Sequence, residues 1–107
     1  MAKGMILEKD DSTFQASIAK GLVLVDFSAT WCAPCRALEP ILEQLSIDIQ
    51  GTCSVVKIDV DASPKVTTQF QITSVPTMIL MKDGTEIQRI VGLKDLETLK
   101  KQILQKA

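Results

Sequence analysis

The sequence contains no histidine. This absence excludes Ser-His and Cys-His hydrolase dyads, zinc sites with imidazole ligands and haem attached through a Cys-His motif. Cysteine is also scarce, because Cys32 and Cys35 form one closely spaced pair and Cys53 stands alone. Three thiols cannot supply a four-cysteine zinc or iron–sulfur site within one chain, and a disulfide-stapled secreted scaffold is equally disfavoured. Dithiol chemistry is the main role left open to the pair.

An excess of one charge and a long hydrophobic run are both missing. Twelve Lys and Arg stand against thirteen Asp and Glu, for a formal net charge of −1, so the composition does not favour nucleic acid or an anionic membrane as a partner. No apolar run approaches the ~18 residues of a membrane span, and the first residues become charged again before a signal-peptide segment develops. Without repeats or linkers, residues 1–107 are expected to form a single domain that is soluble and cytoplasmic.

The hydrophobic pattern predicts alternating strands and helices. Apolar residues at three- and four-residue steps predict long helices over 38–49 and 96–104, and shorter helices are expected after Ser12 and at Ser63-Pro64. Apolar and β-branched runs predict strands at 5–7, 22–27, 55–60, 77–81 and 86–91. Asp83-Gly84 predicts a tight hairpin between the last two strands, and Pro40 should bend the first long helix. This order predicts an α/β domain with three layers, α/β/α, around a mixed sheet.

The segment Trp31-Cys32-Ala33-Pro34-Cys35-Arg36 lies between the strand at 22–27 and the first long helix. Cys32 should therefore occupy a helix N-terminus, where unpaired N–H groups and the positive end of the helix dipole stabilise a thiolate. Cys32 is the expected nucleophile, and Cys35, one turn later and less exposed, is the expected resolving thiol. An isolated Cys-x-x-Cys can also be structural or bind metal, but the strand–helix context favours a redox motif.

Asp26 interrupts the apolar strand at 22–27. A carboxylate in that position loses its hydration unless it is protonated or finds a partner. We interpret Asp26 as a buried acid that exchanges protons with the resolving thiol, directly or through water; the alternative is a side chain at a frayed strand end or one turned to solvent. Lys57, in the middle of another predicted strand, is a candidate charge partner or a solvent-facing lysine of an edge strand.

Two further residues, Trp31 and Gly92, each allow two interpretations, whereas Pro76 and Cys53 each have one. Trp31 could belong to the core or form an apolar platform for a partner beside a reactive cysteine. Pro76 stands directly before a strand, where a proline is tolerated, and Gly92 either ends a strand or lets foreign backbone approach closely. Cys53 is interpreted as a small buried hydrophobic residue without a catalytic role.

These motifs together resemble the thioredoxin family over essentially the whole chain. The segments that carry the resemblance are 25–36, Pro40, 57–61, 75–77, Asp83-Gly84 and Val91-Gly92. The resemblance implies a five-stranded mixed sheet flanked by four helices, and reduction of protein disulfides by a redox-active Cys32–Cys35 pair. It implies no bound cofactor or metal, because electrons would come from NADPH through a separate flavoprotein thioredoxin reductase. The implied partners are that reductase and disulfide-containing proteins, with the protein itself a monomer.

Carried over by position, the resemblance makes Cys32 the attacking thiol, Cys35 the resolving thiol, and Asp26 with Lys57 a buried pair that manages protons. The rim that receives an extended substrate segment comprises Trp31, Ala33, Pro34, Val75, Pro76 and Gly92, with Pro76 cis. Ala33 replaces the usual Gly, and Ser28 stands where an aromatic residue is common; both departures bear on redox potential and partner preference. An oxidase or isomerase with the same thiols, and a binding module with incidental cysteines, are the alternatives.

Overall fold

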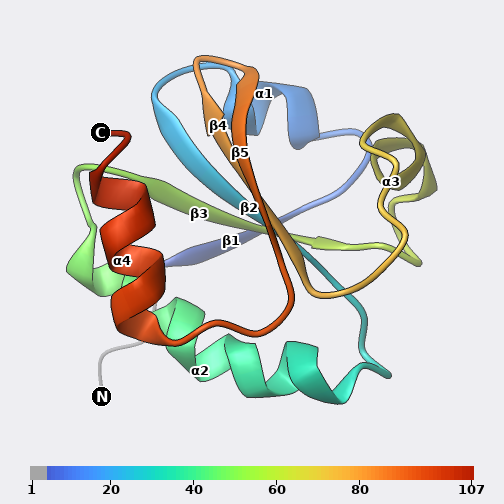
Figure 1. The fold of residues 1–107 in the computed structure, drawn as a ribbon. Helices are drawn as coiled ribbons and strands as arrows, with labels where there is room; N and C mark the ends of the chain where they lie inside the picture. The colour runs from blue at the N-terminus through green and yellow to red at the C-terminus, as the bar shows by residue number, and fades with distance from the viewer. Residues whose placement is uncertain (1–4) are drawn as a thin grey trace.

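The computed structural model describes residues 5–107. Its elements in chain order are β1 (Ile6–Lys9), α1 (Phe14–Ile18), β2 (Leu22–Ser28), α2 (Ala33–Asp48), β3 (Ser54–Asp59), α3 (Pro64–Gln69), β4 (Thr77–Lys82), β5 (Thr85–Val91) and α4 (Leu96–Leu104) (Figure 1). The alternation of strands and helices expected from the hydrophobic pattern is confirmed. The first strand is shifted toward the C-terminus relative to the expected 5–7.

The strands form one mixed sheet in the order β1-β3-β2-β4-β5. β1, β3 and β2 run parallel, whereas β4 pairs antiparallel with both β2 and β5. β2 occupies the centre and is buried at all seven positions, as expected for a strand covered on both faces. The hairpin between β4 and β5 turns at Asp83 and Gly84, which both have positive φ, as the Asp-Gly signal predicts.

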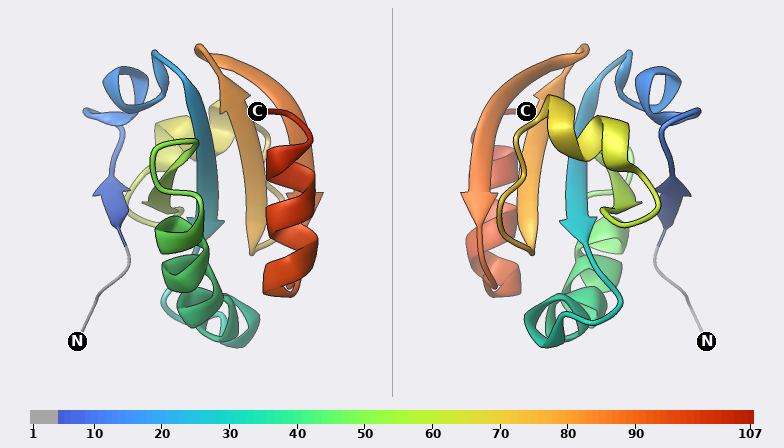
Figure 2. Two further views of the ribbon diagram at one scale, coloured as in Figure 1. Left: turned by 90° about the vertical axis from the view of Figure 1, so that its left-hand side faces the viewer. Right: turned by 90° about the vertical axis from the view of Figure 1, so that its right-hand side faces the viewer.

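Helices cover both faces of the sheet, α2 and α4 on one and α1 and α3 on the other (Figure 2). The two-residue period of β2 sends Leu22 and Leu24 into the core under α2 and α4, and Val23, Val25 and Phe27 into the core under α1 and α3. By the same period Asp26 lies on the α2 face. The expected three-layer arrangement with a five-stranded mixed sheet is confirmed.

Helix α2 begins directly after Cys32, which is its N-cap residue. Pro34 lies in the first turn, where a missing N–H leaves no hydrogen bond unmade. Pro40 lies inside the helix and does not end it, because the helix continues to Asp48. Cys35 is therefore in the first turn of a long helix whose apolar face is buried against the sheet.

The start of α1 differs from the sequence-based expectation, which placed the cap at Ser12. The N-cap residue is Thr13, and its side chain makes no capping hydrogen bond. The Asp10 carboxylate organises this turn instead, accepting the N–H groups of Ser12 at 2.9 Å and Thr13 at 3.2 Å. A carboxylate can accept several hydrogen bonds at once, so the Asp10 side chain alone accepts both of these N–H groups.

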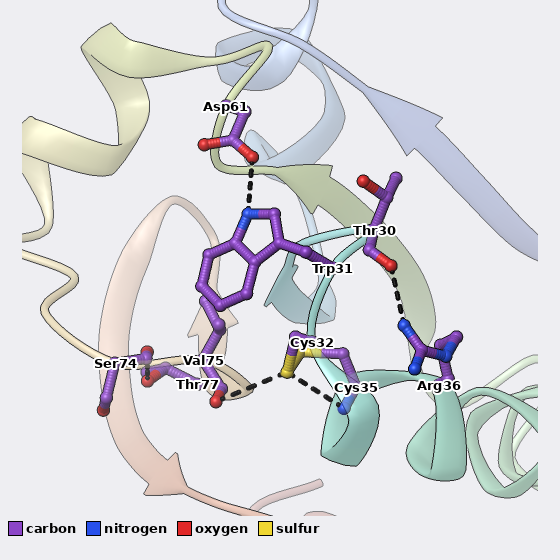
Figure 3. Close-up of a disulfide and its surroundings, with 9 residues drawn as sticks. All are labelled: Thr30, Trp31, Cys32, Cys35, Arg36, Asp61, Ser74, Val75 and Thr77. Atoms are coloured by element: carbon purple, nitrogen blue, oxygen red, sulfur yellow. Dashed lines mark hydrogen bonds between the residues drawn. A yellow bond between two sulfur atoms is a disulfide. The ribbon is translucent and has the colours of Figure 1, made fainter.

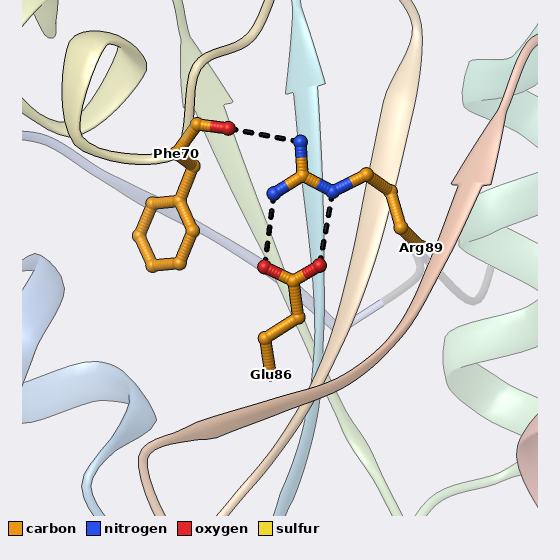
Figure 4. Close-up of polar contacts among 3 residues, drawn as sticks. All are labelled: Phe70, Glu86 and Arg89. Atoms are coloured by element: carbon orange, nitrogen blue, oxygen red, sulfur yellow. Dashed lines mark hydrogen bonds and ion pairs between the residues drawn. The ribbon is translucent and has the colours of Figure 1, made fainter.

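A polar clamp ties β5 to the loop that follows α3 (Figure 4). Arg89 donates two hydrogen bonds to the Glu86 carboxylate, at 2.9 and 3.0 Å, and a third to the carbonyl oxygen of Phe70 at 2.9 Å. The next residue, Gln71, has a φ of 53°. The clamp therefore holds the chain at the beginning of the loop that leads to Val75-Pro76.

Replacing a buried leucine of α2 should destabilise the fold far more than replacing a half-exposed leucine of α4. Leu42 is buried in the core, and Leu104 is 50% exposed. Leu42→Ala should lower the free energy of unfolding by about 2–5 kcal/mol, and Leu104→Ala by about 1 kcal/mol or less. Urea unfolding of the two variants measures both losses, and equal losses would contradict the placement of these side chains.

Candidate active site

Cys32 and Cys35 are joined by a disulfide at the N-terminus of α2 (Figure 3). Their Cα atoms are 5.2 Å apart, and the Cys35 N–H donates a hydrogen bond to the Cys32 sulfur at 3.2 Å. Cys32 is 5% exposed and Cys35 7%, so the expectation that Cys35 is the less exposed of the two is wrong. The two sulfurs differ in their hydrogen bonding, because the Cys32 sulfur accepts the Cys35 N–H from the first turn of α2.

The Val75-Pro76 loop lies against the disulfide. The carbonyl oxygen of Val75 is 3.7 Å from the Cys32 sulfur, and the Val75-Pro76 peptide bond is cis, as the resemblance implies. Thr77 donates its hydroxyl to the carbonyl oxygen of Ser74 at 2.7 Å. Gly92, with a φ of 93°, donates its N–H to the carbonyl oxygen of Pro76 at 2.9 Å. The structure thus brings three of the expected rim residues to one place beside Cys32.

Trp31 is a surface residue, 67% exposed, and not part of the core. Its indole N–H donates a hydrogen bond to Oδ2 of Asp61 at 2.9 Å, which holds the ring beside the disulfide (Figure 3). A hollow of about 140 Å³ lies between the indole and the loop that ends at Val75. Ala33 and Pro34, the remaining rim residues, are exposed in the first turn of α2. The platform interpretation of Trp31 fits this geometry.

Asp26 is buried, 3% exposed, and among the described residues its Oδ1 has no hydrogen-bond partner. Burial raises the pKa of this carboxyl to about 7; the positive charge of Lys57 opposes the rise, and the negative charge of Glu39 adds to it. The interpretation of Asp26 as a buried acid is therefore supported, and the alternative of a solvent-facing side chain is wrong.

Lys57 is the direct neighbour of Asp26 across the β2–β3 ladder, but its ammonium is bonded elsewhere. Its Nζ lies 3.3 Å from Oε1 of Glu39 on α2, with side-chain exposures of 26% and 49%. Only one member of the expected buried pair is buried: Asp26 is enclosed, whereas Lys57 reaches the surface. Both Lys57 and Glu39 line a pocket of about 240 Å³ behind Cys35, to which the small Ser28 side chain also contributes.

Sequence reasoning missed Glu39 and Asp61. Glu39 follows Cys35 by four residues on α2, and this spacing places both on one helix face. That signal was available once Cys35 was assigned to the first turn of the helix. Asp61 lies just beyond the end of β3, thirty residues from the indole it binds. Only the parallel pairing of β2 with β3 brings it near Trp31.

Among residues 5–107, no helix combines the length and the hydrophobicity that a membrane crossing requires. These residues also contain no group of three or more His, Cys, Asp or Glu side chains placed to hold a metal ion.

Comparison with known proteins identifies the family. Residues 5–105 match the family model described as Thioredoxin. The chain is 48% identical over 99 residues to thioredoxin of Chlamydia muridarum, which covers 92% of this chain and 96% of that protein. It is 42% identical over 94 residues to thioredoxin of Staphylococcus haemolyticus, covering 88% and 90%, and 38% identical over 94 residues to thioredoxin of Staphylococcus aureus, covering the same shares.

The Cys32–Cys35 disulfide at the start of α2 and the similarity to thioredoxins together show that the protein is a thiol–disulfide oxidoreductase. The chain belongs to the thioredoxin family.

Asp26 should make the stability of the protein fall as the pH rises. The native state holds the Asp26 proton up to about pH 7, whereas the unfolded chain releases it near pH 3.9. The free energy of unfolding contributed by this group is therefore fully present below the unfolded pKa and is lost as pH rises through the folded pKa. Asp26→Asn, which does not titrate, should gain roughly 3–4 kcal/mol relative to wild type between pH 4 and pH 8.

Urea unfolding of wild type and Asp26→Asn across that range measures the gain, and comparison with the variant cancels the other titrating groups. A wild type that gains stability relative to the variant as pH rises would mean that Asp26 is charged and paired in the native state.

Cys53 should be a bystander in the reaction. It is buried directly before β3, and burial raises the pKa of its thiol to about 11, partly opposed by a hydrogen bond from the backbone of Leu24. Because β2 and β3 are parallel, the start of β3 lies at the opposite edge of the sheet from Cys32. Cys53→Ser should keep at least about half of wild-type insulin reduction, since buried thiols are inert. Loss of most activity in a folded variant would reveal a third working thiol.

Proposed function

We propose that the protein is a cytoplasmic protein-disulfide reductase that acts as a monomeric single domain. The observation that carries this proposal is the position of Cys32, as N-cap of α2, with the Cys35 N–H 3.2 Å from its sulfur and the Val75-Pro76 loop beside it. The helix terminus favours negative charge on Cys32 once the disulfide is reduced. Cys35 makes its hydrogen bond through its backbone, so its own thiol receives no comparable support.

The reaction proceeds in two exchanges. The Cys32 thiolate attacks one sulfur of the substrate disulfide, the substrate S–S bond breaks, and the departing thiolate takes a proton from solvent. Cys35 then loses its proton, attacks the Cys32 sulfur of the mixed disulfide, and closes the Cys32–Cys35 bond while the second substrate thiolate departs and is protonated. The substrate gains two electrons and two protons, and the cysteine pair supplies the two electrons.

Asp26 is the proposed acceptor of the Cys35 proton. A carboxyl with a pKa of about 7 is present in both forms near neutral pH, which suits a group that takes up and returns a proton. The pocket behind Cys35, lined in part by Lys57, offers a polar route between the thiol and solvent. Lys57 contributes by stabilising the charged form of Asp26.

The rim around Cys32 is the proposed binding surface for an extended segment of the substrate protein. It comprises Trp31, Ala33, Pro34, Val75, Pro76 and Gly92. The exposed indole supplies an apolar surface, and the turn at Gly92 brings backbone close without a side chain. Ala33 adds one methyl group to the first turn of α2, at the edge of this surface.

The oxidised pair must be reduced again for a further cycle. We propose that electrons reach it from NADPH through a separate flavoprotein thioredoxin reductase, so that the chain needs no bound cofactor of its own. Its role would then be electron transport to disulfide-containing proteins and maintenance of the redox balance of the cell. Turnover of insulin disulfides with dithiothreitol as reductant distinguishes such an enzyme from a binding module with incidental cysteines.

Single serine substitutions should separate the roles of the two thiols. Cys32→Ser should abolish insulin reduction because the attacking sulfur is gone, and it should form no mixed disulfide with substrate. Cys35→Ser should attack once and remain linked to its substrate, because no thiol is left to resolve the mixed disulfide. Non-reducing electrophoresis and mass spectrometry in the Cys53→Ser background measure the trapped species. Trapping by Cys32→Ser but not by Cys35→Ser would reverse the two roles.

A further inference from the structure

Lys57 has carboxyl groups of different burial as neighbours, among them Asp26 and Glu39. Asp26, its neighbour across the β2–β3 ladder, is enclosed, and its Oδ1 has no partner among the described residues. Glu39, on α2, is half exposed and holds the Lys57 Nζ at 3.3 Å from its Oε1. The cation has therefore engaged the carboxylate that remains hydrated and has left the enclosed one without an ion pair. The pairing of strands does not explain this ion pair, because the sheet places Asp26, not Glu39, next to Lys57.

The charged and titratable groups around Asp26 come from few elements. Lys57 faces it from β3, whereas the register neighbour on β4 is the apolar Met78. Helix α2 contributes Cys35 and Glu39 to the adjoining pocket. The same pocket is also lined by the charged side chains of Arg36, Asp59 and Glu8, and Glu8 is the neighbour of Lys57 on β1. Among the described residues, no pocket-lining side chain comes from α4, which packs on this face of the sheet through Leu99 and Ile103.

We propose that Glu39 is a positioning residue for the thiol–disulfide exchange: its carboxylate holds the Lys57 ammonium at the rim of the pocket, away from the enclosed Asp26 carboxyl, and thereby favours the protonated form of Asp26. The effect on the exchange rests on the proposed role of Asp26 as acceptor of the Cys35 proton. Glu39 lies one turn after Cys35 on α2, so the same helix carries both the thiol and the group that holds Lys57.

Two electrostatic effects of Glu39 act in the same direction. The Lys57–Glu39 ion pair limits how closely the cation can approach Asp26, and an ammonium engaged in an ion pair stabilises a second carboxylate less. The negative charge of Glu39 also disfavours a second negative charge nearby. Both effects favour the protonated form of Asp26. Removal of the Glu39 charge frees Lys57 to turn toward the buried carboxylate.

The direct test is an NMR titration of the Asp26 side-chain carboxyl carbon in the oxidised protein. Glu39→Gln should lower the titration midpoint of Asp26 by roughly half a unit to one unit, less than for a fully buried pair because Glu39 is half exposed. Glu43→Gln removes the same charge from an exposed position one turn along α2, outside the pocket lining, and should leave the midpoint unchanged. An equal shift in both variants, or none in Glu39→Gln, would overturn the proposal.

Lys57→Met separates the two effects of Glu39. In a protein without the ammonium only direct repulsion remains, so Glu39→Gln should lower the Asp26 midpoint by less than half as much as it does in the presence of Lys57. A shift of the same size with and without Lys57 would show that Glu39 acts by repulsion alone, and the positioning role would be wrong.

The pH dependence of single-turnover insulin reduction connects this electrostatic effect to the reaction. The part of the rate profile that follows the titration of Asp26 should move to lower pH in Glu39→Gln, by the shift of the Asp26 midpoint that NMR measures. In Glu43→Gln it should not move. Asp26→Asn should lack that part of the profile. A wild-type profile in Asp26→Asn would instead contradict the proton-accepting role of Asp26, whereas the NMR titrations would still decide whether Glu39 controls its protonation.

Discussion

The enclosure of one carboxyl group in the central strand is the constraint on which both the stability of the fold and the proposed chemistry depend. Every residue of β2 is buried, yet its fifth residue is Asp26, whose Oδ1 lacks a hydrogen-bond partner in the described part of the chain. A buried group of this kind is costly to ionise, so its pKa rises to about 7. The desolvation that lowers the stability of the fold at neutral pH also gives the site the proton acceptor that we propose for Cys35. Stability and the proposed proton transfer thus depend on one desolvated side chain.

The topology of the sheet explains why the other groups of the site meet close to that carboxyl. β2 and β3 are parallel, so their carboxyl ends share an edge, and Ser28 pairs with Asp59 there. β4 is antiparallel to β2 and begins at the same edge, where Thr77 pairs with Phe27. Cys32 follows β2 directly, and Val75-Pro76 precedes β4 directly. Residues from three distant parts of the chain therefore surround one disulfide, and loops at the carboxyl ends of parallel strands are where α/β folds place their sites.

Much of this arrangement could be predicted from the sequence because it follows local rules. Hydrophobic period and turn residues predict the order of elements, and the apolar flanks of Asp26 predict its burial. Val75-Pro76 as a cis bond and the rim around it followed only from resemblance to a family, since base rates favour trans. The partner of Lys57 could not be predicted, because Asp26 and Glu8 flank it in the sheet and Glu39 lies on α2, so the partner depends on side-chain conformation and hydration. The Trp31–Asp61 hydrogen bond was missed for a similar reason, as it depends on strand pairing across thirty residues.

The central claim, that the Cys32–Cys35 pair serves to reduce other disulfides, is tested most directly by its equilibrium with a glutathione redox buffer. Oxidised and reduced protein are separated after acid quenching, and the ratio gives the reduction potential of the pair. If the account is right, the reduction potential of the Cys32–Cys35 pair should be about −270 mV, so that the reduced pair converts glutathione disulfide to glutathione and is itself oxidised. A potential near about −120 mV, typical of a strong oxidant, would contradict the account.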